Sequence, residues 1–509
     1  MPKIRLPWCG ALLAAAALVP LSAAAQQQCG DLVEPPTMHA HGDTLRMAPA
    51  TYRVGDSTFT TNVYNRHFVA PTIHIERGDT LRLYVVNAMV PNANQPDSTI
   101  AITNQHYHGL VVTPNPVHGD NVTSVKISRD TAWYFDFPVP VDVNHEGMYW
   151  YHPHPHGNTS TQVAGGLSGA LMIGSILTYF PQYRGVRERT LLVRDMTFNG
   201  NSNPLLNVNG STCVTMRVRR GHPELWHIGN FDANTFVNLK LPGMKWTLLG
   251  MDGNHLTRPL RVDSLYLAPG SRAEVIVEAP PATVSRVPFI TAPVDASTPG
   301  PTDTLGYLVT EALPLGSARP ASAVAAPPTG PEPAGDDALA LATIRSLREA
   351  ASVQKRRFTY QFLGNTSAGI DSTIYSPDEP PINVPIDSVQ EWTLVNQTGN
   401  RHTFHIHQTD ITIVSINGVP VTENFLRDNV PLGVHPDGNG NFAGDTVVVR
   451  FKFPRVAMGP FVFHCHVLIH EDQGMMRNVC AYDANDPDGQ AKCNAYFSGN
   501  GGHAGHGGH

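Results

Sequence analysis

The most informative segment of this sequence lies near the C-terminus, where the chain reads His464-Cys465-His466-Val467-Leu468-Ile469-His470-Glu471-Asp472-Gln473-Gly474-Met475. Along a β-strand, successive side chains point to opposite faces, so Cys465 must point away from its two histidine neighbours. One strand would then serve two sites, with a thiol on one face and two imidazoles on the other.

The cysteine face of this segment has the composition of a copper site. With His402 from an earlier segment, Cys465, His470 and Met475 supply two imidazoles, one thiolate and one weak thioether. These are the ligands of a blue-copper electron-transfer centre. A structural zinc site would use paired cysteines such as C-x-x-C, and the sequence contains no such pair.

The imidazole face has counterparts elsewhere in the chain, because His-x-His pairs occur four times. The other three pairs are His106-Tyr107-His108, His152-Pro153-His154 and His405-Ile406-His407. A single His-x-His pair on a strand is more often a partly exposed polar face than a pair of ligands. Eight imidazoles brought together without a metal, however, would be poorly solvated and would repel one another when protonated. Four pairs in a chain with 24 histidines therefore predict a cluster of several metal ions.

A weak internal repeat indicates three domains. Each copy is a turn that enters a strand ending on asparagine, and the copies cover residues 77–87, 220–230 and 387–396. The spacing between copies is the size of a domain, which excludes a solenoid. Short alternating runs rich in Val, Thr, Tyr and Phe surround the copies, between turn residues. We therefore predict an all-β chain of three Greek-key β-sandwich domains.

Composition excludes other classes of protein. The chain has 509 residues, 35 Lys and Arg, 42 Asp and Glu, and a net charge of −7, with no basic block for binding nucleic acid. Lys3 and Arg5 precede an apolar run and three small residues, Ala23-Ala24-Ala25, which together indicate a signal peptide. No other stretch is long and apolar enough to insert into a membrane. We expect an exported protein, periplasmic or secreted.

These observations give expected boundaries for each part of the chain. They are a signal peptide (1–25), a first domain (26–180), a second domain (181–313), a Pro/Ala-rich linker (314–352), a third domain (353–485) and a C-terminal tail (486–509) with a His/Gly-rich end. Within the linker, residues 337–352 are expected to form one short helix.

Five cysteines remain after removal of the signal peptide, and an odd number leaves one outside any disulfide. As a thiolate ligand, Cys465 would be that one. The other four can pair in three ways, and Cys480 could bridge Cys493 or tie down another part of the chain.

Taken together, the four histidine motifs resemble those of the multicopper oxidases, the laccase-like family built from three cupredoxin domains. The resemblance covers the whole mature chain, and further landmarks are Ala70-Pro71-Thr72-Ile73, Asp252-Gly253 and Leu267-Ala268-Pro269-Gly270-Ser271-Arg272. It implies four copper ions. His402, Cys465 and His470 would hold the type 1 copper with Met475 axial, His106 and His405 the type 2 copper, and His108, His152, His154, His407, His464 and His466 the type 3 pair. The second domain has no histidine pair and would be a spacer and wall.

The family resemblance also implies a reaction. A small reducing substrate gives single electrons to the type 1 copper, and Cys465 passes them to His464 and His466. Four electrons then reduce dioxygen to water between the first and third domains. Because this reduction consumes protons, a carboxylate should lie nearby, and Glu471 is the candidate relay. Asp120 is a weaker candidate, since the loop after His108 departs from the family pattern.

The remaining histidines receive simpler interpretations. His156 is expected to orient a ligand without being one. His67, His74, His118, His222 and His435 have no partner at ligand spacing and are expected to be ordinary surface or core residues.

Four functions remain for comparison. The first is the oxidation of phenols and aromatic amines, and the second is the oxidation of cuprous or ferrous ions in metal tolerance. The 13 methionines are scattered and form no Met-rich segment for Cu(I), which favours the organic substrate. A scaffold that has lost copper would lack ligands that are all present here. A two-domain nitrite reductase would lack the third repeat.

Overall fold

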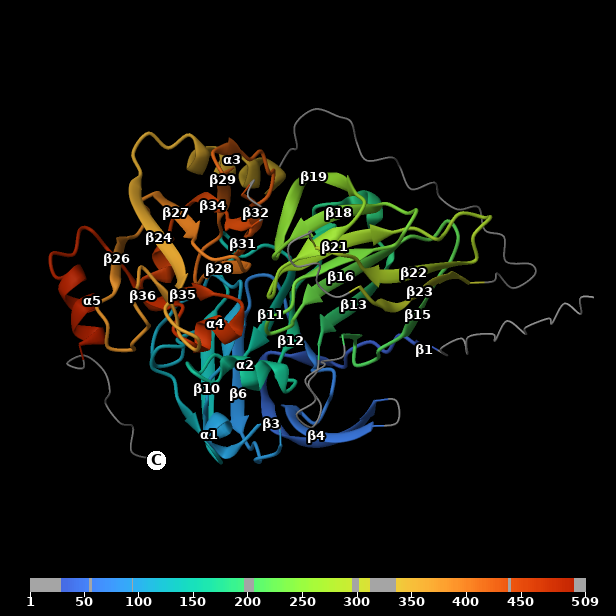
Figure 1. Cartoon of the computed structure of the whole chain (residues 1–509), viewed down its shortest axis with the longest axis horizontal. Coiled ribbons are helices and arrows are strands. Elements are labelled where there is room, and N and C mark those ends of the chain that lie inside the picture. Colours follow the sequence, from blue (N-terminus) through green and yellow to red (C-terminus); the bar gives the residue numbers. More distant parts are fainter. Residues whose placement is uncertain are drawn as a thin grey trace, which may run out of the picture.

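The computed structural model describes residues 29–498, apart from 55–56, 94, 196–205, 295–301, 312–335 and 438–440. The expected signal peptide, the Pro/Ala-rich part of the linker and the His/Gly-rich end lie outside the described residues. Six large sheets form three lobes, drawn in blue to cyan, green to yellow, and orange to red (Figure 1). The prediction of an all-β chain with three two-sheet domains is confirmed.

The first lobe contains a sheet of order β10-β6-β3-β4 and a sheet of order β2-β5-β12-β11-β8. Its strands and helices are β2 (Thr37–His39), β3 (His41–Val54), β4 (Ser57–Tyr64), β5 (Thr72–Ile75), β6 (Thr80–Asn87), α1 (Asp97–Ile100), β7 (Ile102–Thr103), β8 (His106–His108), β9 (Ile127–Ser128), β10 (Ala132–Pro138), β11 (Gly147–His152), α2 (Thr159–Ala164) and β12 (Gly169–Ile173). Two 3-10 turns, η1 (Ile176–Thr178) and η2 (Pro181–Tyr183), lead to the second lobe.

The second lobe contains sheets of order β1-β15-β23-β22-β17-β20 and β14-β13-β16-β21-β18-β19. Its strands are β1 (Gly30–Asp31), β13 (Arg187–Arg194), β14 (Asn207–Val208), β15 (Val214–Val218), β16 (Glu224–Asn230), β17 (Val237–Lys240), β18 (Trp246–Met251), β19 (Asn254–Val262), β20 (Leu265–Leu267), β21 (Arg272–Val277), β22 (Arg286–Thr291) and β23 (Thr304–Thr310). The first described strand of the chain thus extends a sheet of the second lobe.

The third lobe contains sheets of order β25-β24-β27-β34-β29-β30 and β26-β36-β35-β28-β31. Its elements are α3 (Asp336–Arg348), β24 (Gln354–Phe362), β25 (Ala368–Ile370), β26 (Ile382–Pro385), β27 (Gln390–Asn396), β28 (His402–Ile406), β29 (Thr412–Ile416), β30 (Val419–Pro420), β31 (Asn429–Leu432), β32 (Val434–Pro436), β33 (Phe442–Gly444), β34 (Thr446–Phe451), η3 (Arg455–Ala457), β35 (Gly459–Cys465), α4 (Leu468–Asp472), β36 (Met476–Tyr482) and α5 (Gly489–Phe497). Helix α3 confirms the expected helix and ends four residues earlier than predicted.

The internal repeat is a repeated structural device. Its three strands, β6, β16 and β27, end on Asn87, Asn230 and Asn396, and all three side chains are buried. Each side-chain amide donates to a backbone carbonyl of another segment: Asn87 to Ile127, Asn230 to Leu267, and Asn396 to Gly433, each at 3.0 Å. Each side-chain oxygen accepts from the backbone amide two residues further on, in Met89, Asp232 and Thr398. Each buried asparagine therefore fixes the loop that follows its strand and joins it to a second segment.

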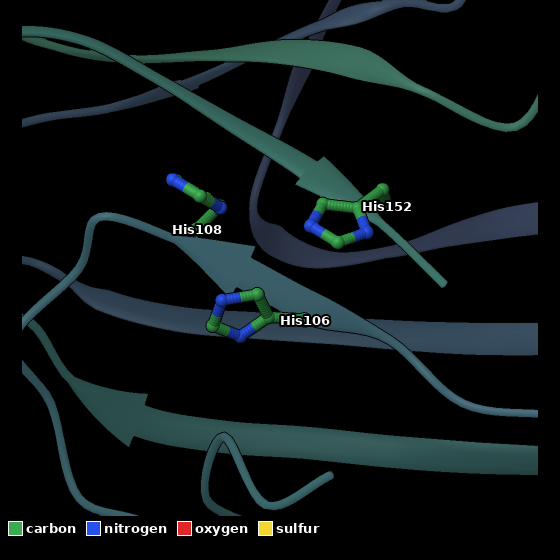
Figure 2. Close-up of side chains that lie close together, drawn as sticks. All are labelled: His106, His108 and His152. Atoms are coloured by element: carbon green, nitrogen blue, oxygen red, sulfur yellow. The ribbon is translucent and has the colours of Figure 1, made fainter. Parts of the chain in front are cut away.

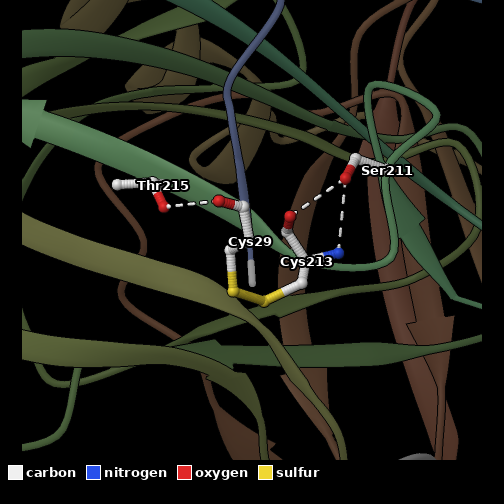
Figure 3. The surroundings of a disulfide bond; sticks show 4 residues. All are labelled: Cys29, Ser211, Cys213 and Thr215. Atoms are coloured by element: carbon white, nitrogen blue, oxygen red, sulfur yellow. Dashed lines mark hydrogen bonds between the residues drawn. A yellow bond between two sulfur atoms is a disulfide. The ribbon is translucent and has the colours of Figure 1, made fainter. Parts of the chain in front are cut away.

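Two disulfides tie the ends of the described chain to the sheets. Cys29 pairs with Cys213, and Thr215 donates to the Cys29 carbonyl beside the bond (Figure 3). Cys480 pairs with Cys493 and holds α5 against β36. Cys465 is the one free cysteine among the described residues, and it is buried. No helix of the described residues is long and apolar enough to cross a membrane.

Candidate functional site

Four strands bring the predicted histidines together between the first and third lobes. In the first lobe, His152 at the end of β11 lies opposite His106 of β8. In the third lobe, His405 of β28 lies opposite His464 of β35. Strands β11, β28 and β35 are labelled near the middle of the molecule in Figure 1. Register places the paired histidines of each lobe side by side, and His154, His407 and His466 lie just after the ends of their strands.

The three first-lobe rings around β8 share one small space. Figure 2 shows His106 and His108 from one strand and His152 from the neighbouring strand, with all three rings close together. Their ring centroids are 5.4 to 5.8 Å apart, and one ligand atom of each lies within 4.8 Å of the others. Such separations suit metal ligands.

Histidines of the third lobe complete the cluster. The His106 ring stacks on His407 at 3.9 Å, and the His108 ring stacks on His405 at 3.8 Å. The Nε2 atoms of His154 and His464 are 3.0 Å apart and point at each other. His466 packs against His108 with ring centroids 4.8 Å apart. All eight histidines of the predicted cluster are therefore brought together.

The state of the ring nitrogens tests whether this cluster fits metal ions. Buried nitrogens without a hydrogen-bond partner include Nε2 of His106, His152 and His405 and both ring nitrogens of His407 and His466. In the first three rings, Nδ1 contacts an oxygen, from Asp120, Pro153 and Asp428 respectively. Burial also lowers the pKa well below its ordinary value in His108, His152, His154, His405, His407, His464 and His466. Neutral imidazoles with free lone pairs are what metal ions need, so the residues fit.

A second candidate metal site lies on the other face of β35. The Cys465 sulfur is 3.4 Å from Nδ1 of His402 and 3.8 Å from Nδ1 of His470. Burial raises the pKa of the Cys465 thiol to about 12, so the thiolate needs a neighbouring cation. Met475 is fully buried in the same hydrophobic cluster as Cys465, and its carbonyl accepts from the Cys465 amide. This arrangement suits a soft metal bound to sulfur and nitrogen.

Two residues that sequence reasoning missed contact this second site. Thr398 Oγ1 lies 2.9 Å from Nε2 of His402, which leaves Nδ1 of that ring facing the sulfur. The ring of Phe362 packs against both His402 and His470, with centroids 5.6 and 5.1 Å away. Phe362 ends β24 and Thr398 lies in the turn after β27, where no periodic pattern marks either residue.

Two carboxylates reach the histidine cluster. Glu471 is fully buried, accepts from Thr159 Oγ1 at 3.1 Å and lies 3.6 Å from Nδ1 of His154. Burial raises the pKa of Glu471 well above its ordinary value. Asp120 is also buried, with Oδ2 3.0 Å from Nδ1 of His106. The structure therefore places both predicted relay candidates within reach of the cluster, including Asp120, for which sequence reasoning was weaker.

The second lobe reaches the cluster as well, which a spacer would not need to do. Its Arg272 is fully buried and donates two hydrogen bonds to Asp428, at 2.8 and 2.7 Å. The Asp428 carbonyl accepts from His405, and its carboxylate lies 3.2 Å from Nε2 of His108. Asp428 belongs to no histidine motif, and Arg272 stood out in the sequence only as part of a family landmark, so this contact was not predicted.

A cavity of about 430 Å³ opens beside the cluster between the first and third lobes. Its lining includes His154, Asn104, Lys126 and Tyr375. His156 also lines this cavity and packs edge-on against Tyr375 at 4.7 Å. His156 is absent from the groups of described residues whose ligand atoms converge.

Known proteins match this architecture. Three family models described as multicopper oxidase match residues 44–176, 147–306 and 347–485, which together make up more than half of the chain. The multicopper oxidase mco of Staphylococcus aureus is 22% identical over 440 residues, covering 82% of this chain and 83% of its own.

Two solved structures share the fold. A Campylobacter jejuni multicopper oxidase, described as a metallo-oxidase, has a TM-score of 0.69 and 22% identity, covering 89% of this chain and 96% of its own. A laccase-like multicopper oxidase from Ochrobactrum sp., with oxidase activity towards lignin model compounds, has a TM-score of 0.68 and 21% identity over 88% of this chain and 100% of its own. With three cupredoxin-like domains and three matching family models, the chain belongs to the multicopper oxidases, a family of copper-dependent oxidoreductases.

Proposed function

We propose that the chain is a laccase-like oxidase, which takes single electrons from phenols or aromatic amines and reduces dioxygen to water. Four such donors each lose one electron, and one dioxygen gains four electrons and four protons to give two water molecules. Four copper ions would supply the redox chemistry: type 1 at His402, Cys465, His470 and Met475, type 2 at His106 and His405, and a type 3 pair at His108, His152, His154, His407, His464 and His466.

The surface beside His470 is the observation that carries the choice of substrate. Phe362, Leu363 and Ile469 expose 38%, 38% and 43% of their area, although they are large apolar residues. We name these three residues the apolar rim. Phe362 touches the His470 ring, and Ile469 precedes His470 in the chain. An aromatic donor gains by packing against such groups, whereas a metal ion needs oxygen, nitrogen or sulfur ligands.

A metal substrate finds less support at this position. Among the described residues, the groups of three His, Cys or carboxylate side chains with converging ligand atoms all belong to the two copper sites. The apolar rim adds no such group beside His470. This contrast favours an organic donor over a cuprous or ferrous ion.

The chain's own residues can perform the remaining tasks. Cys465 and His464 are consecutive, so a path of a few covalent bonds joins the two sites. Glu471, buried and with a raised pKa, would hold a proton beside His154 and deliver it where dioxygen is reduced. The cavity next to His154 would admit dioxygen and release water.

Export is part of the proposal. Two disulfides among the described residues support an oxidising compartment, periplasmic or extracellular. This agrees with the signal peptide expected from the sequence.

The test is oxygen consumption by the copper-loaded protein, with a methoxyphenol and with Cu(I) supplied in parallel. We expect turnover of the phenol without added copper. Phe362→Ala should lower kcat/KM for the phenol roughly two- to tenfold, the value of one aromatic contact. Val419→Ala, at an exposed apolar residue of β30, is the matched control and should change nothing.

Other outcomes would redirect the proposal. Turnover of Cu(I) alone, or of the phenol only with extra copper, would move the function to metal-ion oxidation. A colourless protein inert to both would contradict the assignment of Cys465.

A further inference from the structure

Three histidines gather on the surface of the first lobe, apart from the copper sites. His39 ends β2, His41 begins β3 and His74 lies in β5. His39 and His74 are direct neighbours in a parallel strand pair. His39 and His41 are both exposed, while Ala40 between them is buried and faces the opposite way. The strands therefore present three imidazoles together, which we name the surface triad.

As they stand, the ligand atoms of the surface triad do not converge as those of the copper sites do, but the rings need only a small movement to share one ion. Centroids of His39 and His41 are 6.1 Å apart, and those of His39 and His74 are also 6.1 Å apart. An imidazole nitrogen binds Zn²⁺ at about 2.0 to 2.1 Å in a tetrahedral site, which places the centroids of two rings on one ion roughly 5 Å apart, so the rings of the surface triad would have to approach by about 1 Å.

The surface triad is wider than the buried groups. In the group of His154, His407 and His464 the ring centroids are 4.7 to 5.5 Å apart. Closing the difference, about 1 Å, requires only side-chain rotation between rotamers. His41, with 55% of its side chain exposed, has room to rotate.

Carboxylates surround the surface triad. Asp79 Oδ2 lies 3.8 Å from Nε2 of His41. Burial lowers the pKa of His74, helped by the neighbouring His39, while the charges of Glu76 and Glu188 act in the opposite direction. The His74 imidazole is therefore neutral at pH 7, with two carboxylates near enough to act on it. Imidazole nitrogens beside a carboxylate suit a divalent ion of the zinc and copper class.

We propose that His39, His41 and His74, with Asp79 as a fourth ligand, bind one divalent transition-metal ion separately from the family's copper sites. The ion would join β2, β3 and β5 across the edge of the first lobe. This site is independent of the proposed oxidase function, and it gives His74 a role that sequence reasoning did not assign.

Zinc is the probe, because copper would also enter the family's sites. The test titrates Zn²⁺ into the copper-loaded full chain by calorimetry, in a parent protein with His503, His506 and His509 replaced by glutamine. We expect the parent to bind one Zn²⁺ that His39→Ala and His74→Ala each lose. His67→Ala and His118→Ala, at exposed histidines of the same lobe, should keep it.

Folding and copper loading are checked on the same samples. The blue absorbance and the rate of phenol oxidation should be equal in the parent, His39→Ala and His74→Ala, so that a lost Zn²⁺ reports the surface triad alone. Asp79→Asn should weaken Zn²⁺ binding without changing its stoichiometry. A parent that binds no Zn²⁺, or a stoichiometry unchanged by His39→Ala and His74→Ala, would overturn the proposal.

Discussion

Replacing Arg272 by methionine tests whether the second lobe supports the histidine cluster. The guanidinium is fully buried and makes two hydrogen bonds to the Asp428 carboxylate, at 2.8 and 2.7 Å. It also donates to the carbonyls of Met148 at 3.2 Å and Gly270 at 3.0 Å. Methionine has a similar length but no donor, so Arg272→Met leaves all of these acceptors without their partner.

The expected loss in the free energy of unfolding follows from the burial of both Arg272 and Asp428. Removing one member of a buried ion pair costs about 3–5 kcal/mol, because the other charge remains in a poorly solvated place. Burial raises the pKa of Asp428, and the neighbouring Arg272 guanidinium lowers it and so keeps the carboxylate charged. Without Arg272 the pKa of Asp428 rises further, and the carboxyl takes up a proton at neutral pH. Protonation of Asp428 limits the loss in the free energy of unfolding, so we expect Arg272→Met to lower it by about 3 kcal/mol.

Copper binding should report the same change. Asp428 holds His405 through its carbonyl and lies against His108 through its carboxylate, so a displaced Asp428 disturbs one ligand from each lobe. We expect Arg272→Met to lose type 2 copper, measured by electron paramagnetic resonance and total copper content. The Cys465 site, on the other face of β35, should keep its blue absorbance.

The assay compares urea unfolding of the copper-free variants, followed by tryptophan fluorescence. Arg219→Met is the matched control, because the Arg219–Glu311 pair has the same chemistry at 2.6 Å but is 57% and 39% exposed. That change should cost less than about 1 kcal/mol. Arg272→Lys keeps the positive charge but cannot make the two parallel hydrogen bonds to Asp428. Its loss in unfolding free energy should lie between those of Arg272→Met and Arg219→Met. An Arg272→Met protein as stable as Arg219→Met, with full type 2 copper, would refute the reasoning.

Three further predictions concern the other sites. Cys465→Ser should abolish the blue absorbance and the oxidation of phenols, while the signal of type 2 copper remains; a variant that stays blue would contradict the thiolate assignment. Thr398→Val removes the oxygen beside Nε2 of His402, makes that imidazole a weaker donor and should raise the type 1 potential in a redox titration; an unchanged or lower potential would count against it. Glu471→Gln should slow oxygen consumption by about 10²- to 10⁴-fold without slowing anaerobic reduction of the type 1 copper, whereas equal effects on both would exclude a proton relay. Because burial raises the pKa of Glu471, wild-type activity should fall as pH rises through that value, and Glu471→Gln should lack this limb.

Regular strands explain why much of the molecule was predictable. The period of two along a strand placed Cys465 opposite to His464 and His466, and the structure shows them on two faces. The repeated strands ending on Asn87, Asn230 and Asn396 gave the three-domain fold, because a buried asparagine leaves a recognisable pattern. The two-sheet fold could therefore be predicted, because the spacing of these residues along the sequence directly reflects the strands that contain them.

Contacts made through loops were not predictable from spacing. Asp428 meets Arg272 across 156 positions of the chain, and no periodic pattern links them. Phe362, at the end of β24, and Thr398, in the turn after β27, reach His402 and His470 from places where neighbouring residues do not repeat. Four cysteines allow three pairings, and only the placement of β1 beside β15 brings Cys29 to Cys213. The surface triad escaped notice because His74 is 33 residues from His41 in the sequence.

The histidine cluster also determines when the protein can mature. His108 and Asn429, which touch within it, are 321 positions apart. Contacts between such distant segments close late in folding, because the loop between them must be ordered first. The cluster cannot exist on a partly made chain, and copper taken up there stabilises only a molecule whose first and third lobes have already docked. Only chains whose first and third lobes have docked could therefore bind metal at this junction, so truncated or misfolded chains would stay inactive.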